Sequence, residues 1–240
     1  METIKNYKEL IKSSSSFYNN NFLKIDYELC RFNYLTLSKY FRGDVGLEMG
    51  PALGQMTKYL IEDFKELHLI EGSNELLSQI PEYPNIFKYN CYFEEFKEEI
   101  CADTIIMSHV LEHLENPVGI LRKFKSFLNN SGVFIISVPN AKSIHRLVAK
   151  DMGLLDSIYS LNERDFALGH YRVYDLDSLT KDCFEAGYEV VERGGVFFKP
   201  LSNNQIENTW TNEMINSFYN IGKHFPEYCA EIFVVLIKKK

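Results

Sequence analysis

The sequence has no long hydrophobic run. No segment of its 240 residues approaches the roughly 20 consecutive apolar residues that a helix needs to cross a bilayer. Residues 1–5 also lack the apolar core of a secretory signal. We therefore expect a soluble, cytoplasmic protein with no membrane partner.

Basic charge is scarce as well. The formal net charge is -7, and the one local basic run is the terminal stretch at residues 238–240. A surface that binds nucleic acid needs a basic patch to neutralise phosphates, so the charge balance excludes a nucleic-acid partner. A small-molecule substrate is expected instead.

Cysteines are few and scattered. The five cysteines stand at positions 30, 91, 101, 183 and 229, and no two of them form a Cys-x-x-Cys pair. This spacing excludes the common zinc and redox motifs and indicates a reducing compartment.

Residues 44–54 are the stretch around which the rest of the chain is organised. A short apolar run passes through Glu48 and ends in Gly50 and Gly54, before a helical pattern spans residues 55–64. The pattern predicts a strand, a tight turn and a helix start. Glycine at position 50 lets a ligand approach bare backbone, and the free N–H groups of a helix start face whatever lies over the turn.

A second acidic residue follows this loop. The apolar run at residues 66–70 ends in Glu71, which comes 23 residues after Glu48. A carboxylate at the end of the second strand can accept both hydroxyls of a ribose.

These two features resemble motif I and the acidic end of strand two in class I S-adenosylmethionine-dependent methyltransferases, whose loop usually reads Glu-x-Gly-x-Gly-x-Gly. Ala52 stands where that loop has its middle glycine, a small departure that is tolerable if its φ stays negative. The resemblance implies S-adenosylmethionine as cofactor and S-adenosylhomocysteine as product. The cofactor-binding residues that it implies are Glu48, Gly50, Pro51, Ala52, Gly54, Glu71, Gly72, Ser73, Tyr92, Phe93, Ser108, His109 and, from an N-terminal lid, Tyr18.

Two further segments carry the resemblance. Residues 92–96 are similar to the family's Asp-x-Glu-x-Leu segment, except that Tyr92 replaces the Asp that usually reads the adenine edge. The backbone amide of Phe93 and the face of an aromatic ring would then contribute more to adenine binding. Residues 108–117 read Ser-x-x-Leu-Glu-His-Leu-x-x-Pro and resemble the motif after strand four of small-molecule methyltransferases.

His109, Glu112 and His113 also fit two metal-site patterns. Their order matches the His-x-x-Glu-His of inverzincin proteases, but that site needs both histidines on one helix face, and His109 is expected at a strand end. Ubiquinone-pathway O-methyltransferases, which this segment resembles, carry acidic and His residues linked to a divalent ion at the matching positions. Because His and Glu here can equally cap a helix and line the cofactor pocket, we expect no metal.

The order of elements predicts an α/β fold. Five βα units followed by a terminal strand pair match the family's Rossmann-like seven-stranded sheet, mostly parallel with an antiparallel last strand and helices on both faces. The methyltransferase domain is expected at residues 42–240, with insertions at about residues 141–170 and 199–225. Residues 1–41 are expected to form an N-terminal helical cap, with helices at residues 5–12 and 26–41.

His170 is the leading candidate for a catalytic base, with His113 as a second catalytic candidate. His170 follows a glycine in the loop before the helix that faces the transferable methyl group in this family. An ordinary imidazole has a pKa of about 6.5 and can accept a proton near neutral pH. If the acceptor were an ionised phosphate oxygen, no base would be needed, and His170 would bind charge together with Arg172.

His145, Arg146, Arg172 and Asn140 are the substrate-binding candidates. A solvated helix face is the alternative for His145 and Arg146. Residues 163–165 are expected at the surface, and residues 197–198 in the core.

Together these features predict a methyltransferase that acts on a small polar acceptor. The resemblance implies an O-methyltransferase whose acceptor is a sugar, nucleotide-linked or phosphate-type intermediate of bacterial cell-surface glycan biosynthesis. The alternatives are a nicotinamide-dependent Rossmann oxidoreductase and a non-catalytic binding protein with the same fold. The expected partner is a small molecule, and a homodimer is left open.

Overall fold

A computed structural model describes residues 23–239. Its centre is one seven-stranded sheet with the strand order β3-β2-β1-β4-β5-β7-β6. Strand β7 runs antiparallel to both neighbours, while the remaining strands share one direction, so the predicted sheet is confirmed. The strands are β1 (Val45–Met49), β2 (Glu66–Glu71), β3 (Ile86–Asn90), β4 (Ala102–Ser108), β5 (Leu128–Pro139), β6 (Tyr188–Val196) and β7 (Glu231–Lys238).

Strand β4 lies in the middle of the sheet and is buried over most of its length. It is largely apolar because a central parallel strand is covered on both faces. Glu48 of β1 pairs in register with Ile106 of β4, and β1 and β4 both end at the same edge of the sheet. Ligands of open α/β sheets bind at this carboxyl edge.

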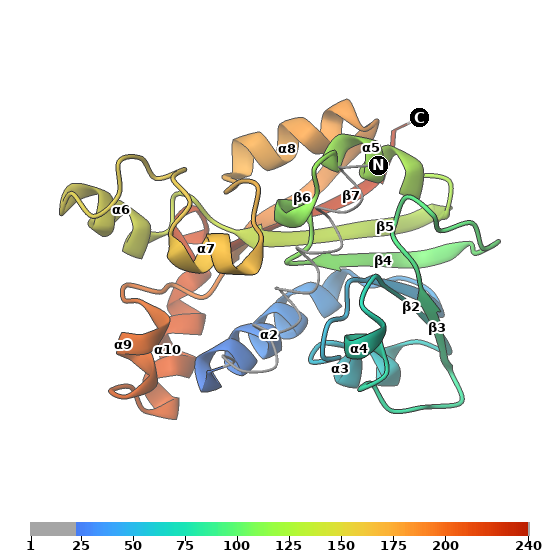
Figure 1. The fold of residues 1–240 in the computed structure, drawn as a ribbon, viewed down its shortest axis with the longest axis horizontal. Coiled ribbons are helices and arrows are strands. Elements are labelled where there is room, and N and C mark those ends of the chain that lie inside the picture. Colours follow the sequence, from blue (N-terminus) through green and yellow to red (C-terminus); the bar gives the residue numbers. More distant parts are fainter. Residues whose placement is uncertain (1–22, 240) are drawn as a thin grey trace.

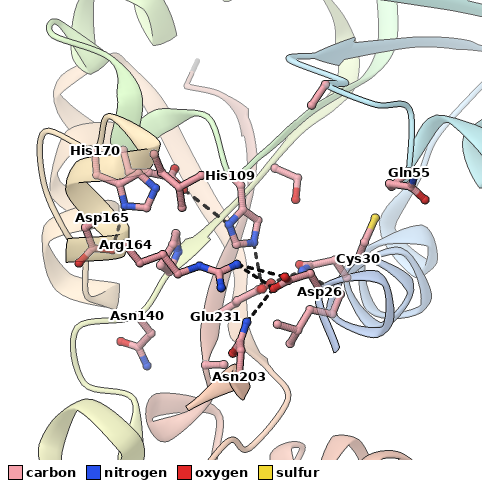
Figure 2. Close-up of a pocket in the computed structure, with 18 of the residues that line it drawn as sticks. Asp26, Cys30, Gln55, His109, Asn140, Arg164, Asp165, His170, Asn203 and Glu231 are labelled. Atoms are coloured by element: carbon pink, nitrogen blue, oxygen red, sulfur yellow. Dashed lines mark hydrogen bonds and ion pairs between the residues drawn. The ribbon is translucent and has the colours of Figure 1, made fainter. Parts of the chain in front are cut away.

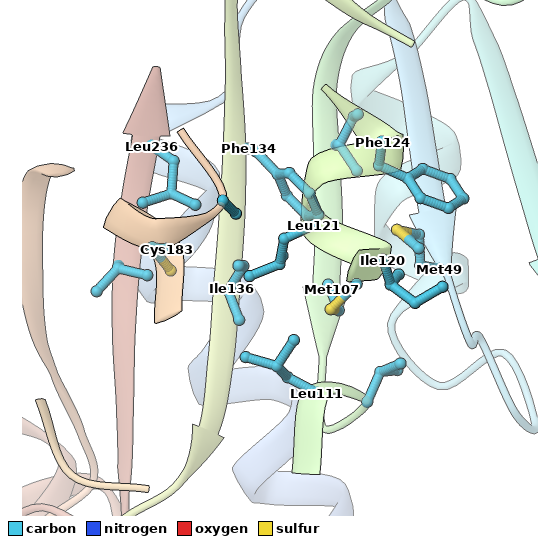
Figure 3. Packing of buried hydrophobic residues seen from close by; sticks show 14 of the residues in the cluster. Met49, Met107, Leu111, Ile120, Leu121, Phe124, Phe134, Ile136, Cys183 and Leu236 are labelled. Atoms are coloured by element: carbon cyan, nitrogen blue, oxygen red, sulfur yellow. The ribbon is translucent and has the colours of Figure 1, made fainter. Parts of the chain in front are cut away.

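Helices cover both faces of the sheet, as expected (Figure 1). Helices α5 (Pro117–Phe124) and α8 (Leu176–Glu185) pack on one face, where Leu121, Phe124 and Cys183 meet apolar side chains of the strands (Figure 3). Burial of such a continuous apolar layer supplies the main favourable contribution to folding.

The opposite face is covered by α2 (Lys24–Leu37), α3 (Thr57–Asp63), α4 (Asn74–Leu77), α9 (Asn203–Glu207) and α10 (Asn212–Gly222). Phe32 of α2 is fully buried there. Its ring stacks on Tyr219 at 4.2 Å and on Phe197 at 5.5 Å, which confirms Phe197 as a core residue.

Several element boundaries differ from those expected. The helix predicted for residues 26–41 is α2 followed by a short 3-10 turn at Ser38–Tyr40, and α3 starts at Thr57 rather than at residue 55. Ser73 caps α4, because its hydroxyl accepts a hydrogen bond from the amide of Leu76 at 3.3 Å. The helix predicted for residues 5–12 and the lid residue Tyr18 lie outside the described residues.

The two expected insertions contain helices next to the carboxyl edge of the sheet. The first holds α6 (Ile144–Asp151) and α7 (Glu163–Leu168), and the second holds α9 and α10. Helices α2, α6, α7 and α9 contribute residues to the wall of the site described below (Figure 1). The division into a cap at residues 1–41 and a domain at residues 42–240 stays a prediction.

Candidate active site

A cavity of about 470 Å³ lies at the carboxyl ends of β1 and β4 and reaches the first residue of β7. Many residues expected at the site line this cavity: Glu48, Gly50, Pro51, Ala52, Ser108, His109, His113, Asn140, His145, Arg146 and His170. Other expected residues do not line it: Gly54, Glu71, Gly72, Ser73, Tyr92, Phe93 and Arg172.

The loop after β1 is held in a left-handed conformation at three positions. Gly50, Ala52 and Gly54 have φ angles of 68°, 47° and 71°. The negative φ on which tolerance of alanine depended is not observed at Ala52, because this turn has a positive φ at every second residue. A methyl-bearing residue is strained in this region.

Gly50 also lies against a core side chain. Its expected role in ligand approach stays a prediction. A Cβ atom at Gly50 would lie 2.6 Å from Cγ2 of Val110, so the side chain that comes closest to this glycine is a packed core residue. The Gly50 amide donates to the carbonyl of Ile70 at 2.9 Å and so holds the loop against the end of β2.

Glu48 is a buried carboxylate in the wall of the cavity. Only 4% of the residue is exposed, and the hydroxyl of Thr57 donates to its Oε2 at 2.6 Å. Burial raises the pKa of Glu48 to about 7; the bond from Thr57 opposes this shift, and the nearby Glu71 adds to it.

Glu71 connects the second strand to the loop. Its Oε1 accepts the amide of Ser73 at 2.8 Å, and its Oε2 accepts the amide of Ala52 at 3.2 Å. Burial raises the pKa of Glu71, and these backbone bonds oppose the shift. A carboxylate can accept more than two hydrogen bonds, so a role in binding a ribose stays a prediction.

His109 follows the last residue of β4 and has a φ of 54°. Its Nε2 lies 3.0 Å from Oε1 of Glu231, and its Nδ1 lies 3.6 Å from Oε1 of Glu112. Burial alone would lower the pKa of His109, but the two carboxylates, Glu231 first, raise it to about 9. His109 is therefore a cation at neutral pH.

His170 is oriented by a carboxylate. Its Nδ1 lies 3.1 Å from Oδ1 of Asp165, and both residues are buried. Burial opposes the charge of Asp165, but the bond from His170 and the amide of Asn162 hold the pKa of this carboxyl below its usual value. With Nδ1–H directed at Asp165, Nε2 of a neutral His170 is left as a proton acceptor.

Asp165 and Arg146 are not on the surface, in contrast to two of the expectations. Arg146 is 6% exposed; it donates to the carbonyls of Ile158 and Ser160, and its Nη1 lies 3.4 Å from Asp165. Helices α6 and α7 pack together through these contacts, which buries both charges as a pair. His145, beside Arg146 on α6, is half-buried and also lines the cavity.

A family model described as a methyltransferase domain matches residues 22–193. The chain belongs to this family. The resemblance to class I S-adenosylmethionine-dependent methyltransferases is confirmed, and the oxidoreductase alternative is wrong. No curated protein sequence matches this methyltransferase.

Solved structures show the same fold at low sequence identity. A possible histamine N-methyltransferase from Thermotoga maritima is 16% identical, with 96% of this chain and 100% of that chain covered and a TM-score of 0.65. The N-methyltransferase NodS from Bradyrhizobium japonicum, in complex with S-adenosylhomocysteine, is 15% identical, with 98% of each chain covered and a TM-score of 0.59. A chain of the Haloferax volcanii complex that contains the Trm112 methyltransferase activator is 11% identical, with 95% and 98% covered and a TM-score of 0.66.

The methyltransferase also brings together a possible set of metal ligands, but not the set considered from the sequence. Glu112, His113 and His170 each offer one ligand atom, and these atoms lie within 4.8 Å of one another. His109 is outside this group and faces Glu231 instead. Burial, with the neighbouring His170 and His109, lowers the pKa of His113 to about 3, so this imidazole is neutral.

Several residues of the cavity wall were missed from the sequence. Asp26 of α2 accepts Arg164 of α7 at 3.0 Å and Asn203 of α9 at 2.7 Å (Figure 2). Lys199 and Glu231 also line the cavity. These residues lie far apart in the chain, and none belongs to a motif, so no local signal could have grouped them.

Two of the substrate-binding candidates are engaged in backbone contacts. The side-chain amide of Asn140 donates to the backbone carbonyls of Glu227 and Cys229, each at 2.8 Å. Arg172 donates to the carbonyl of Glu115 at 3.2 Å, away from the cavity. A role of either residue in substrate binding stays a prediction.

All five cysteines are free. Within residues 23–239, the helices are too short or too polar to span a membrane.

Proposed function

We propose that this methyltransferase transfers the methyl group of S-adenosylmethionine to an oxygen atom of a small polar acceptor. The acceptor class implied by the family resemblance is a sugar, nucleotide-linked or phosphate-type intermediate of bacterial cell-surface glycan biosynthesis. The wall of the cavity supports a polar acceptor, because Glu112, His170 and Lys199 line it together with two ion pairs.

The residues around the loop fit the cofactor. Glu48 is a buried carboxylate beside the loop and suits the cationic amino group of the cofactor, and Glu71 is expected to accept its ribose hydroxyls. The cofactor supplies a sulfonium methyl group that an acceptor lone pair attacks in line. The protein contributes positioning, exclusion of water and, where the acceptor is a hydroxyl, removal of its proton.

The observation that supports an oxygen acceptor most directly is the contact between His170 and Asp165 at 3.1 Å. Asp165 fixes the tautomer in which Nε2 of His170 carries a lone pair, so an acceptor hydroxyl placed against Nε2 would lose its proton to His170 as the new C–O bond forms. Arg146 holds Asp165 from the other side and keeps this arrangement rigid. We therefore assign His170 as the base and Asp165 as its positioning residue.

Cofactor binding is tested by calorimetry with S-adenosylhomocysteine. Glu71→Gln should weaken binding by about 1.5 to 3 kcal/mol if it removes one charge-assisted hydrogen bond to the ribose. Glu66→Gln is the matched control, because Glu66 lies on the same strand with an exposed side chain. Unchanged affinity in a folded Glu71→Gln variant would exclude Glu71 from the cofactor site.

The acceptor atom is tested by mass spectrometry of products from a panel of hydroxyl, phosphate and amine compounds. With a hydroxyl acceptor, His170→Gln should lower kcat by about a hundredfold or more and leave the affinity for S-adenosylhomocysteine unchanged. With an ionised phosphate acceptor, the same change should mainly raise KM. Two structural neighbours are described as N-methyltransferases, and exclusive methylation of amines would contradict the oxygen assignment.

A further inference from the structure

Lys199 is a buried cation in the wall of the cavity. It follows β6 in the chain, only 9% of the residue is exposed, and it lines the cavity. Its ammonium group donates to the side-chain oxygen of Asn203 at 2.6 Å. An ammonium group has three N–H donors, so this bond accounts for one of them.

The other cations around the cavity each face a carboxylate. Arg164 contacts Asp26 at 3.0 Å, Arg146 contacts Asp165 at 3.4 Å, and His109 contacts Glu231 at 3.0 Å. Lys199 has no carboxylate in ion-pair contact within residues 23–239 and meets an uncharged amide oxygen instead. Asp26 and Glu231 influence Lys199 over a longer distance, but both are already paired.

Leaving a charge buried and unpaired costs free energy. Burial lowers the pKa of Lys199 to about 8, although Glu231 opposes the shift. The side chain is therefore still mostly protonated at neutral pH, and no carboxylate among residues 23–239 is in ion-pair contact with it. Such a group persists where a ligand supplies the missing partner.

Asn203 fixes the direction of this ammonium group. Its Nδ2 donates to Oδ1 of Asp26 at 2.7 Å, and Asp26 is held in turn by Arg164 (Figure 2). With the amide nitrogen committed to Asp26, the amide oxygen is the atom that faces Lys199. The ammonium is thus positioned by a connected set of side chains rather than by a flexible surface contact.

We propose that Lys199, positioned by Asn203, is an anion-binding subsite that recognises a carboxylate or phosphate group of the methyl acceptor, separate from the oxygen that is methylated. This inference rests on the proposed function, because it assumes that the acceptor occupies the cavity beside the cofactor. It narrows the acceptor to an anionic compound, such as an acidic or phosphorylated sugar. A neutral acceptor would leave the Lys199 charge unpaired in the complex.

The test is calorimetric titration of inorganic phosphate, and separately of acetate, into the complex with S-adenosylhomocysteine. Lys199→Met keeps most of the length of the side chain and removes its charge, and we expect it to weaken anion binding about tenfold or more. Lys199→Arg keeps the cation and should retain most of the binding. Lys223→Met is the matched control, because Lys223 is exposed and donates to the side-chain oxygen of Asn220 in the same way.

A stability measurement separates this role from a structural one. Removal of an unpaired buried charge should leave the melting temperature of Lys199→Met unchanged or raise it, whereas loss of a structural contact would lower it. Preference for phosphate over acetate, or the reverse, identifies which anion the subsite takes.

Three results would overturn the subsite: no anion binding to the wild type, equal binding by Lys199→Met and wild type, or a clear fall in melting temperature with unchanged anion binding. Failure of the proposed function gives a different result, since the wild type would then not bind S-adenosylhomocysteine in the first titration. The wild type could also bind anions through Lys199 and yet not bind S-adenosylhomocysteine. That result would refute both the methyl-transfer assignment and the link between the subsite and the methyl acceptor.

Discussion

His109 Nε2 lies 3.0 Å from Oε1 of Glu231, and this ion pair joins the end of β4 to the first residue of β7. The side chain of Asn33 on α2 also donates to Glu231. The pair therefore ties one helix and two strands together at the wall of the cavity. Its charge depends on pH, because the carboxylates beside His109 raise the pKa of this residue to about 9.

The stability that this pair contributes should decrease at alkaline pH. The folded-state pKa of His109 lies above the ordinary value of about 6.5, so the contribution is complete below about pH 6.5 and is lost as the pH rises through about 9. We expect Glu231→Gln to lower the free energy of unfolding near neutral pH and to have little effect above about pH 10. Chemical denaturation at several pH values measures this effect. The control is Glu227→Gln, which changes an exposed side chain. A difference in the free energy of unfolding between Glu231→Gln and wild type that did not vary with pH would contradict the prediction.

Replacing Glu48 should raise the stability of the fold but weaken the binding of the cofactor product. Its folded-state pKa of about 7 lies above the ordinary value for Glu, so its ionisation destabilises the fold as the pH rises, with the full cost present above about pH 7. Glu48→Gln should therefore stabilise the protein at about pH 8 by up to about 3 kcal/mol and make no difference near pH 4.

The same Glu48→Gln variant should bind S-adenosylhomocysteine more weakly than the wild type, since the proposed partner of the cationic amino group has lost its charge. Glu62→Gln, an exposed change on α3, should alter neither property. If Glu48→Gln destabilised the protein at every pH, the buried carboxylate would be a structural requirement and not a binding group.

Asp165→Asn should impair catalysis through His170. The amide no longer stabilises the imidazolium that forms when His170 accepts a proton, so kcat should fall about tenfold to a hundredfold with a smaller change in KM. In a His170→Gln background the same change should add little, because the two residues act as one unit. Glu163→Gln, exposed on the same helix, is the control; additive effects in the double variant would rule out the positioning role.

Ala52→Gly should stabilise the loop. The φ of Ala52 is 47°, where a Cβ atom costs about 1 to 2 kcal/mol, partly offset by the greater freedom of glycine in the unfolded chain. We expect a net gain of up to about 1 kcal/mol in thermal or chemical unfolding. The control Ala149→Gly, inside α6, should instead lower the free energy of unfolding by up to about 1 kcal/mol. If both changes destabilised the protein by a similar amount, the left-handed conformation at position 52 would be contradicted.

Phe32→Ala should destabilise the fold by about 3 to 5 kcal/mol, the range for loss of a fully buried aromatic ring. Phe32 connects α2 to the sheet and to α10 through its stacked contacts with Phe197 and Tyr219. Leu35→Ala on the same helix, where the side chain is 37% exposed, should change the free energy of unfolding by about 0.5 kcal/mol or less. Similar effects of the two changes would show that α2 is not anchored through Phe32.

The sheet and the place of the cofactor loop could be predicted because both depend on local patterns. The buried run in β4 and the acidic ends of β1 and β2 are visible in the chain, and the carboxyl ends of parallel strands share one edge of the sheet. The φ of Ala52 could not be predicted in this way. Alanine usually avoids positive φ, and here the turn between β1 and α3, held by the bond from the Ala52 amide to Glu71, imposes it.

By itself, the sequence determined the fold class, the family and one half of the site. These depend on strand periodicity, glycine spacing and the residues after β4, which are local patterns that can be read along the chain. The tertiary structure alone decided the other half. Asp26, Lys199 and Glu231 come from three distant segments and meet only because α2 and α9 pack against the strands next to β7. Whether a charged side chain such as Asp165 is solvated or buried depends on the partner that folding brings to it, and that partner is set by long-range packing rather than by local sequence.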